Sequence, residues 1–184
     1  YQSPNAGGFT LEALLGIKPN GRSEPDYMGW EVKAHAGDRI TLMTPEPNGG
    51  FYGERGSEAF IRQYGYERPD RSWYFTGVHK VGALQKKTQL TLVLDGFDAV
   101  GEKILDVNGG INLIDSNGCL AASWSFSGLM SHWGRKHANA AYVRYEKHKA
   151  IPHNVRFLSP IQMGVGTSFT KFLAAMHDGS VIYD

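Results

Sequence analysis

The most informative segment of the sequence is Glu24-Pro-Asp-Tyr-Met-Gly-Trp-Glu-Val-Lys-Ala-His35. From Trp30 onward, apolar and polar side chains alternate strictly to the end of the segment. Alternation with a period of two is typical of a strand that is buried on one face only. The segment therefore predicts a strand whose polar face carries Glu31, Lys33 and His35.

Three ionisable side chains of this segment are expected to converge. Glu31 and Lys33 are two residues apart on the predicted strand, so they project in the same direction, about 7 Å apart. Asp26 lies five residues before Glu31, and the intervening Gly29 can bend the chain and turn Asp26 toward the same face. The pattern thus brings two carboxylates and one lysine to one place.

Hydrolysis of a phosphodiester bond uses these groups. Carboxylate oxygens such as those of Asp26 and Glu31 hold Mg²⁺, which keeps several waters and takes phosphate oxygens as further ligands, and Mn²⁺ has a similar preference. Such a metal lowers the pKa of a bound water and neutralises charge in the transition state. We expect Lys33 to hold the attacking water or hydroxide, and Glu12 to be an outer ligand through water. The same triplet also occurs as surface charge on exposed strands, so the residues alone leave both interpretations open.

Composition limits the class of protein. The 184 residues predict a single domain that spans residues 1–184, and the net charge of +1 does not by itself indicate a nucleic-acid partner. The single cysteine, Cys119, excludes an internal disulfide, fits a reducing compartment and is expected in the core. No apolar run reaches the roughly 18 residues of a membrane span. Because the sequence begins at Tyr1 without a methionine, we expect a domain excised from a longer chain, with room for an additional DNA-binding domain.

Positive charge is concentrated in residues 131–157, here called the basic segment. Its basic residues are opposed by one acid, Glu146, and they are Arg135, Lys136, Arg144, Lys147, Lys149 and Arg156. Clustered positive charge is the usual mark of a polyanion site, although a solvated basic face has the same composition. We expect Arg135, Lys136 and His137, at the end of a helix, to contact DNA, with Arg144 reading a base and Lys147 or Lys149 contacting phosphate. Folding is expected to bring this basic wall, including Arg156, across one cleft from the acids.

The remaining pattern predicts an α/β (α+β) fold with a mixed central sheet and flanking helices. A short helix over Leu11–Leu15 is expected to be capped by Thr10, and the strand at 30–35 to form a hairpin with residues 39–44. Further helices are expected from Ser57, from Phe126 and from Thr167 to Gly179. The remaining expected strands cover residues 73–78, 89–94, 111–114, 120–124, 141–149 and 155–162.

Several segments together resemble the MvaI/BcnI restriction endonucleases, members of the PD-(D/E)XK nuclease superfamily. The segments are Gly7-Gly-Phe-Thr-Leu-Glu-Ala-Leu-Leu-Gly-Ile17, Pro25-Asp-Tyr-Met-Gly-Trp-Glu-Val-Lys33, Ile40-Thr-Leu-Met-Thr-Pro-Glu-Pro-Asn-Gly-Gly50, Lys136-His-Ala-Asn-Ala-Ala-Tyr-Val143 and Gly166-Thr-Ser-Phe-Thr-Lys-Phe-Leu173. They occur in order over nearly the whole chain. A more remote resemblance is to the strand-nicking endonuclease of methyl-directed mismatch repair.

The resemblance implies an active site at Asp26, Glu31 and Lys33, with Glu12 in the accompanying helix. It implies a restriction endonuclease with a restriction-endonuclease-like fold, which acts as a monomer on double-stranded DNA in a prokaryotic cytoplasm. It also implies that the two strands of a short CC-N-GG-type pseudopalindrome are cut in successive reactions. Two alternatives stay open: a repair endonuclease that nicks one strand, and a DNA-binding module without catalytic activity.

Overall fold

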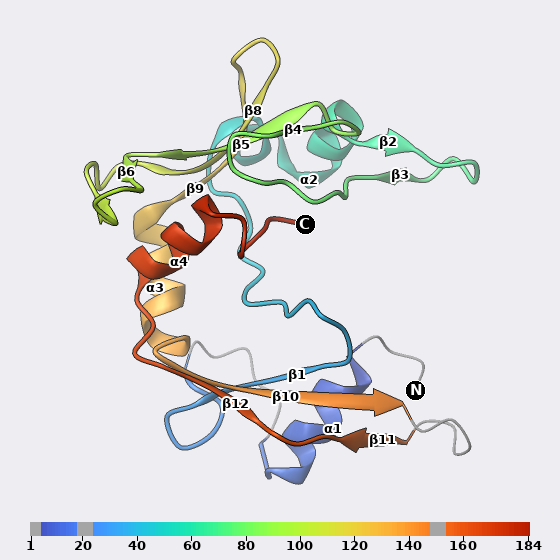
Figure 1. Ribbon diagram of the computed structural model, residues 1–184. Coiled ribbons are helices and arrows are strands. Elements are labelled where there is room, and N and C mark those ends of the chain that lie inside the picture. Colours follow the sequence, from blue (N-terminus) through green and yellow to red (C-terminus); the bar gives the residue numbers. More distant parts are fainter. Residues whose placement is uncertain (1–4, 18–23, 148–153) are drawn as a thin grey trace. The chain divides into compact units, whose positions relative to one another are not determined.

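The computed structural model describes residues 5–17, 24–147 and 154–184, without the side chains of residues 132 and 134–136 (Figure 1). The chain forms two compact units. Unit 1 comprises Tyr1–Thr44 and His132–Ser168, and unit 2 comprises Pro45–Ser131 and Phe169–Asp184. The two units are a division by contacts within the chain. That residues 1–184 form a single domain stays a prediction.

Unit 1 is built on a mixed sheet of four strands. They are β1 (Glu31–His35), β10 (Asn139–Lys147), β11 (Val155–Phe157) and β12 (Gln162–Val165). β1 runs parallel to β10, whereas β11 and β12 both pair with β10 in antiparallel orientation. The predicted hairpin between residues 30–35 and 39–44 is wrong, because residues 39–44 form no strand and the partner of β1 lies about a hundred residues later in the chain.

The strand predicted over residues 155–162 is divided into β11 and β12. The two strands are separated by residues 158–161, which include Pro160. Proline has no N–H group to donate to a ladder, so a continuous paired strand through this position is unfavourable. The break lets the chain pair twice with β10, first near Tyr145 and then near Ala141.

Helix α1 (Ala6–Leu14) lies against this sheet. It begins four residues before the predicted cap, and the Thr10 hydroxyl donates to the Ala6 carbonyl oxygen at 2.8 Å within the helix instead of capping it. Its end agrees with the prediction, since Leu15 is the C-cap and Gly16 has a φ of 74°. A side chain in place of Gly7 would collide with the Tyr145 ring of β10, so this glycine allows α1 to approach the sheet closely.

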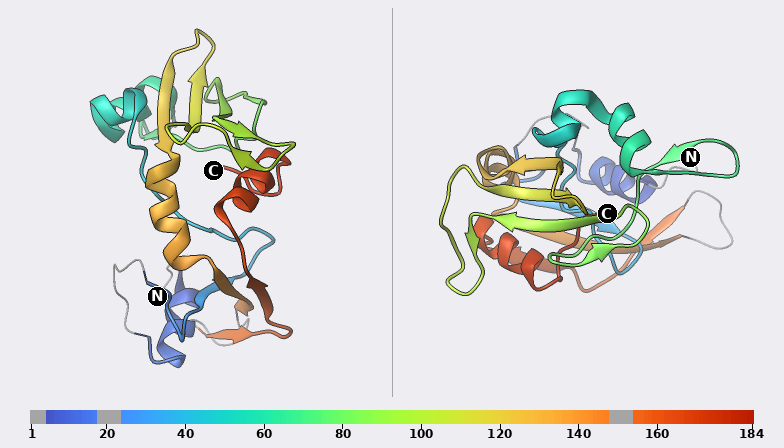
Figure 2. Two further views of the ribbon diagram at one scale, coloured as in Figure 1. Left: turned by 90° about the vertical axis from the view of Figure 1, so that its left-hand side faces the viewer. Right: turned by 90° about the horizontal axis from the view of Figure 1, so that it is seen from above.

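Unit 2 contains an antiparallel sheet in the order β4–β5–β8–β9, with α2 packed against β9. The bounds are β4 (Leu84–Gln85), β5 (Leu90–Asp95), β8 (Gly110–Asp115), β9 (Leu120–Ser125) and α2 (Gly50–Tyr64). The right-hand view of Figure 2 shows the green and yellow strands of this sheet side by side. The predicted helix from Ser57 is the second part of α2, which is interrupted at Gly56, where φ is 79°.

Two small hairpins complete the strands of unit 2. They are β2 (Tyr66–Glu67) with β3 (Trp73–Tyr74), and β6 (Phe97–Asp98) with β7 (Lys103–Ile104). The strand predicted over residues 73–78 is thus limited to β3. Cys119, expected in the core, is exposed in the turn between β8 and β9.

The remaining helices were both expected from the sequence. In α3 (Phe126–Lys136), the Ser125 hydroxyl accepts a hydrogen bond from the Gly128 N–H at 3.3 Å, as a residue that caps a helix does. In α4 (Phe169–His177), the apolar residues Phe169, Phe172, Leu173 and Met176 are all buried. The α+β class with a mixed sheet is confirmed. Among the described residues, none of the helices combines the length and apolar character needed to cross a membrane.

Candidate active site

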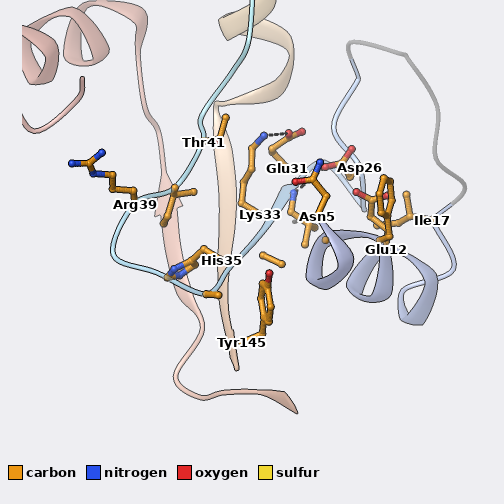
Figure 3. A pocket seen from close by; sticks show the side chains of 16 residues that line it. Asn5, Glu12, Ile17, Asp26, Glu31, Lys33, His35, Arg39, Thr41 and Tyr145 are labelled. Carbon is orange, nitrogen blue, oxygen red and sulfur yellow. Dashed lines mark hydrogen bonds and ion pairs between the residues drawn. The ribbon is translucent and has the colours of Figure 1, made fainter. Parts of the chain in front are cut away.

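A cavity of about 590 Å³ follows β1 in unit 1 (Figure 3). It is lined by residues of α1, of the segment before β1, of β1 itself and of the loop after it. All four residues predicted for the cleavage centre line this cavity: Glu12, Asp26, Glu31 and Lys33. Their catalytic role stays a prediction, but the structure brings them to one place.

Asp26 reaches this cavity because the chain reverses sharply just after it. The N–H of Tyr27 donates to the carbonyl oxygen of Trp30 at 3.0 Å, and the N–H of Trp30 donates back at 2.8 Å. The two residues between them, Met28 and Gly29, have φ angles of 48° and 84°, as in a two-residue turn with both central residues left-handed. This reversal places Asp26 beside β1, where its Oδ2 accepts a hydrogen bond from the Val32 N–H at 3.1 Å.

Glu31 and Lys33 form an ion pair on the same face of β1. The Lys33 Nζ lies 3.0 Å from the Glu31 Oε1, and the Glu31 side chain is 4% exposed whereas that of Lys33 is 24% exposed. A carboxylate withdrawn from water is costly unless it is paired, and the Lys33 ammonium is such a partner for Glu31. Because Lys33 keeps part of its surface open, its ammonium group can also contact a molecule in the cavity.

The carboxylate oxygens in this cavity fit a hard cation such as Mg²⁺. Within the described part of the chain, no group of three or more His, Cys, Asp or Glu side chains is arranged to hold a metal ion. Asp26 and Glu31 offer two carboxylates, which is the number that Mg²⁺ usually takes from a protein, the rest being waters and phosphate oxygens. Glu12 lines the same cavity from α1, and its role as an outer ligand stays a prediction.

Tyr142 of β10 also belongs to the surroundings of this site, although it was not among the predicted residues. It is the register partner of Lys33. Burial raises the pKa of the Tyr142 phenol, and the negative charge of Glu31 raises it further. No local pattern in the sequence indicates Tyr142, because its place depends on the pairing of β1 with β10.

Of the residues predicted to contact DNA, Arg144 and Lys147 are exposed on β10. Arg156 is exposed as well, but its guanidinium lies 2.9 Å from the Glu146 carboxylate, so its charge is compensated. The side chains of Arg135 and Lys136, and the whole of Lys149, lie outside the described residues.

His137, also predicted to contact DNA, is buried. The residue is 4% exposed, and its ring stacks on Trp133 with centroids 4.6 Å apart. The helix spacing indicates this burial, because residue 137 lies on the same face as the apolar residues Phe126, Leu129 and Trp133. A ring buried in this way contributes to the packing of unit 1, and its contact with DNA stays an untested prediction.

The solved structures that resemble this chain include two of one restriction endonuclease. The complex of restriction endonuclease MvaI with its cognate DNA substrate has a TM-score of 0.73 at 14% identity, over 97% of this chain and 72% of that one. Restriction endonuclease MvaI in the absence of DNA has a TM-score of 0.47 at 14% identity, over 97% of this chain and 80% of that one. A search of curated protein sequences found no match.

The likeness to the MvaI–DNA complex confirms the fold that the sequence predicts, a restriction-endonuclease-like α+β arrangement. The sequence comparison is more specific, because the profile of one protein family matches residues 2–184. With a match of this extent, the chain belongs to the MvaI/BcnI restriction endonuclease family.

Proposed function

We propose that this chain is a Mg²⁺-dependent endonuclease that hydrolyses phosphodiester bonds of double-stranded DNA at a specific sequence. The observation that carries the proposal is the placement of the Asp26 carboxylate and the Glu31–Lys33 ion pair in one cavity of unit 1. Membership in a family of restriction endonucleases supports the same reaction. The surface-charge interpretation of this triplet is disfavoured, since Glu31 is buried.

The metal would be held by the carboxylates of Asp26 and Glu31. When bound, it supplies a water of lowered pKa and positive charge for the phosphate, and Mn²⁺ has the ligand preferences to replace Mg²⁺. The residues fit this role because both carboxylates are fixed in place. The Val32 N–H orients Asp26, and the Lys33 ammonium orients Glu31.

Lys33 has the second role in the reaction. Its ammonium group is the partly exposed member of the pair, so it can hold the attacking water or hydroxide against the scissile phosphate. The water oxygen bonds to phosphorus while the bond from phosphorus to the leaving sugar oxygen breaks. The attacking water gives up a proton and the leaving oxygen takes one up. A positive charge fixed beside the attacking oxygen stabilises the negative charge of that transition state.

For the substrate, the family resemblance favours a short CC-N-GG-type pseudopalindrome with an A·T or G·C pair at its centre. The enzyme would bind as a monomer and cut the two strands in successive reactions. The neighbouring structure holds MvaI with its cognate DNA, which supports double-stranded DNA as the partner. A cytoplasmic location and a further DNA-binding domain elsewhere in the full-length protein belong to the same proposal.

The test is incubation of the purified chain with supercoiled plasmid and Mg²⁺, followed by sequencing of the fragment ends. Discrete linear fragments with a common end sequence are expected. Open circles alone would indicate a nicking enzyme, and a shifted band without cutting would indicate a binding module without catalysis. Glu31→Gln is the inactivating variant. Its matched control is Glu58→Gln, the same chemical change at an exposed carboxylate of α2.

A further inference from the structure

Unit 1 has a second cavity, of about 430 Å³, beside the candidate active site. Its lining includes Arg144 of β10 and Gln162 of β12. His35, at the end of β1, and Ile40 line both this cavity and the one that contains Glu31 and Lys33. The two cavities are therefore adjacent, with His35 and Ile40 between them.

The register of the sheet shows why these side chains share a surface. His35 lies opposite Arg144, two positions along from the pair Lys33 and Tyr142, and Tyr142 in turn lies opposite Gln162. Residues paired across strands project from the same face of a sheet. The polar face that begins with Glu31 and Lys33 thus continues without interruption to Arg144 and Gln162.

The groups that this second cavity presents are mainly hydrogen-bond donors. The Arg144 guanidinium is exposed, and among the described residues no ion pair compensates its charge. Gln162 adds an exposed amide, and the His35 ring is held by a hydrogen bond of 2.8 Å between Nδ1 and the Gly37 carbonyl oxygen. One carboxylate, that of Asp38, also lines the cavity. Arginine presents a planar fork of donors that matches the oxygens of a phosphate group.

We propose that this cavity is a subsite for the sugar-phosphate backbone of the strand being cut, in which Arg144 binds a phosphate next to the scissile one. The proposal rests on the proposed function and changes the role predicted for Arg144 from reading a base to positioning the strand. Residue 35 lies about 7 Å beyond residue 33 along β1, and residue 144 about 4.8 Å across from it. Phosphates of one DNA strand follow each other with a rise of about 3.4 Å along the helix axis. Both side chains are long, so a strand whose scissile phosphate lies at Lys33 can present a neighbouring phosphate to Arg144.

The test uses the full chain and a duplex with the cleavage site located on plasmid DNA. In a set of such duplexes, single phosphates near the cut are replaced one at a time by uncharged methylphosphonates. At one position within about two nucleotides of the cut, the replacement is expected to slow the unaltered protein by roughly tenfold to a hundredfold. Arg144→Ala is expected to cleave the normal duplex slowly. Its cleavage rate should not fall further when that one phosphate is replaced by the methylphosphonate. Arg62→Ala, which removes the same charge from α2, should behave like the unaltered protein.

Two results would overturn the subsite. In the first, Arg144→Ala is slowed by every methylphosphonate as much as the unaltered protein is. In the second, the loss of cleavage rate in Arg144→Ala depends only on the identity of one base pair, which would make Arg144 a base reader. Arg144→Lys keeps the positive charge and replaces Arg144→Ala in the test if the alanine variant does not fold. It should retain part of the sensitivity to the methylphosphonate.

The proposed function and the subsite fail in different ways. If the unaltered chain binds DNA but cuts none with Mg²⁺ or Mn²⁺, the proposed function fails. The subsite is then decided by binding of a labelled duplex in Ca²⁺ at several salt concentrations. Loss of one phosphate contact lowers the slope of log K against log salt by about 0.9, and an unchanged slope for Arg144→Ala rejects the subsite. Absence of any DNA binding rejects both.

Discussion

Glu31 and Lys33 contact each other across two positions of β1, with the lysine Nζ 3.0 Å from the glutamate Oε1. Side chains two apart in a strand point the same way but are normally separated by nearly 7 Å at their backbones. The long lysine side chain bends back to close this gap. The contact makes the charge of the buried carboxylate and the position of the ammonium group depend on each other, and this dependence can be measured.

We predict that Lys33→Ala destabilises the fold by about 1–3 kcal/mol, because it leaves the buried Glu31 carboxylate without its lysine. The partly exposed lysine keeps the effect below that of a fully buried pair. Chemical denaturation of the two single variants and of the double variant Glu31→Ala/Lys33→Ala gives the coupling energy. The exposed pair Glu58 and Arg62 is the control, and its coupling should be at most about 0.5 kcal/mol. A coupling at Glu31–Lys33 no larger than that would contradict the prediction.

A second prediction concerns the turn after Asp26, which positions this residue beside β1. Gly29 has a φ of 84°, and a Cβ added there meets no atom within 4 Å, so only backbone strain opposes a side chain. Gly29→Ala should therefore cost about 1–2 kcal/mol and slow DNA cleavage, because the reversal that fixes Asp26 is weakened. Gly29→Asn should recover much of both, since asparagine tolerates left-handed backbone better than alanine. Urea unfolding and plasmid cleavage rates provide the two readouts, and equal behaviour of the two variants would refute the argument.

The difference between what the sequence predicted and what it missed follows from the range of the interactions. The convergence of Asp26, Glu31 and Lys33 depends on one tight turn and one short strand, both local, so alternation and a single glycine were sufficient. The parallel pairing of β1 with β10 joins Glu31 to Ala140, and nothing near residue 31 encodes that partner. Tyr142 and the second cavity depend on this pairing and were missed for the same reason.

Within the helices, spacing alone could not distinguish neighbouring positions. Met130 shares the i, i+4 pattern with Phe126, yet it is half exposed, whereas Trp133 and His137 are buried. A helix stripe indicates a face, but the edge of that face is fixed by what packs against it. A histidine ring is polar but can also stack on an aromatic ring. The charges near His137 favoured a DNA contact, whereas tertiary packing places its ring in the interior.

The third prediction concerns pH. His79 in unit 2 is fully buried, its Nε2 lies 2.9 Å from the Thr88 hydroxyl, and its ring stacks on Phe75. Burial lowers the pKa of His79 below its usual value of 6.5, although the neighbouring backbone groups of Gly77 and Tyr183 and the charge of Asp184 act in the other direction. The unfolded chain therefore binds a proton at His79 before the folded protein does. Stability from this group is complete above pH 6.5 and is lost as the pH falls toward the lowered folded-state pKa.

Thermal unfolding between pH 7 and pH 5 measures this effect. The Tm of the unaltered protein should fall over that interval, and that of His79→Gln should fall less steeply from a lower starting value. His177→Gln, at an exposed histidine in the last turn of α4, is the control and should keep the original slope. If the His79 variant shows the original slope as well, the buried ring does not titrate as argued.

The fourth prediction concerns the metal. Cleavage should occur with Mg²⁺ or Mn²⁺ and stop in EDTA or Ca²⁺, while Ca²⁺ should still support DNA binding. All three ions accept the oxygen ligands of Asp26 and Glu31, but Ca²⁺ has a looser coordination and activates water poorly. Plasmid cleavage and a binding assay in parallel separate the two effects, and each of Asp26→Ala and Glu31→Ala should abolish cutting while binding changes by only a few-fold. Activity that persists with zinc after removal of Mg²⁺ would require a different site.

The last prediction tests the basic segment through the pair of Arg156 and Glu146. These residues face each other across β10 and β11, with the guanidinium 2.9 Å from the carboxylate, and both side chains are more than half exposed. An exposed pair of this kind contributes about 0–1 kcal/mol to stability, so breaking it does not threaten the fold. It does cancel the charge that Arg156 offers to DNA. Glu146→Gln should therefore strengthen DNA binding at moderate salt. It should also steepen the slope of log K against log salt by about the amount expected for one more phosphate contact.

The double variant Glu146→Gln/Arg156→Ala should remove this gain, because the released arginine is its source. Lys171→Ala on α4 serves as the control for loss of one positive charge elsewhere. Anisotropy titrations of a labelled duplex at several salt concentrations give both the affinity and the slope. If Glu146→Gln changes neither, this end of the basic segment lies away from the DNA, and the backbone contacts must then be sought nearer the active site, at Arg144.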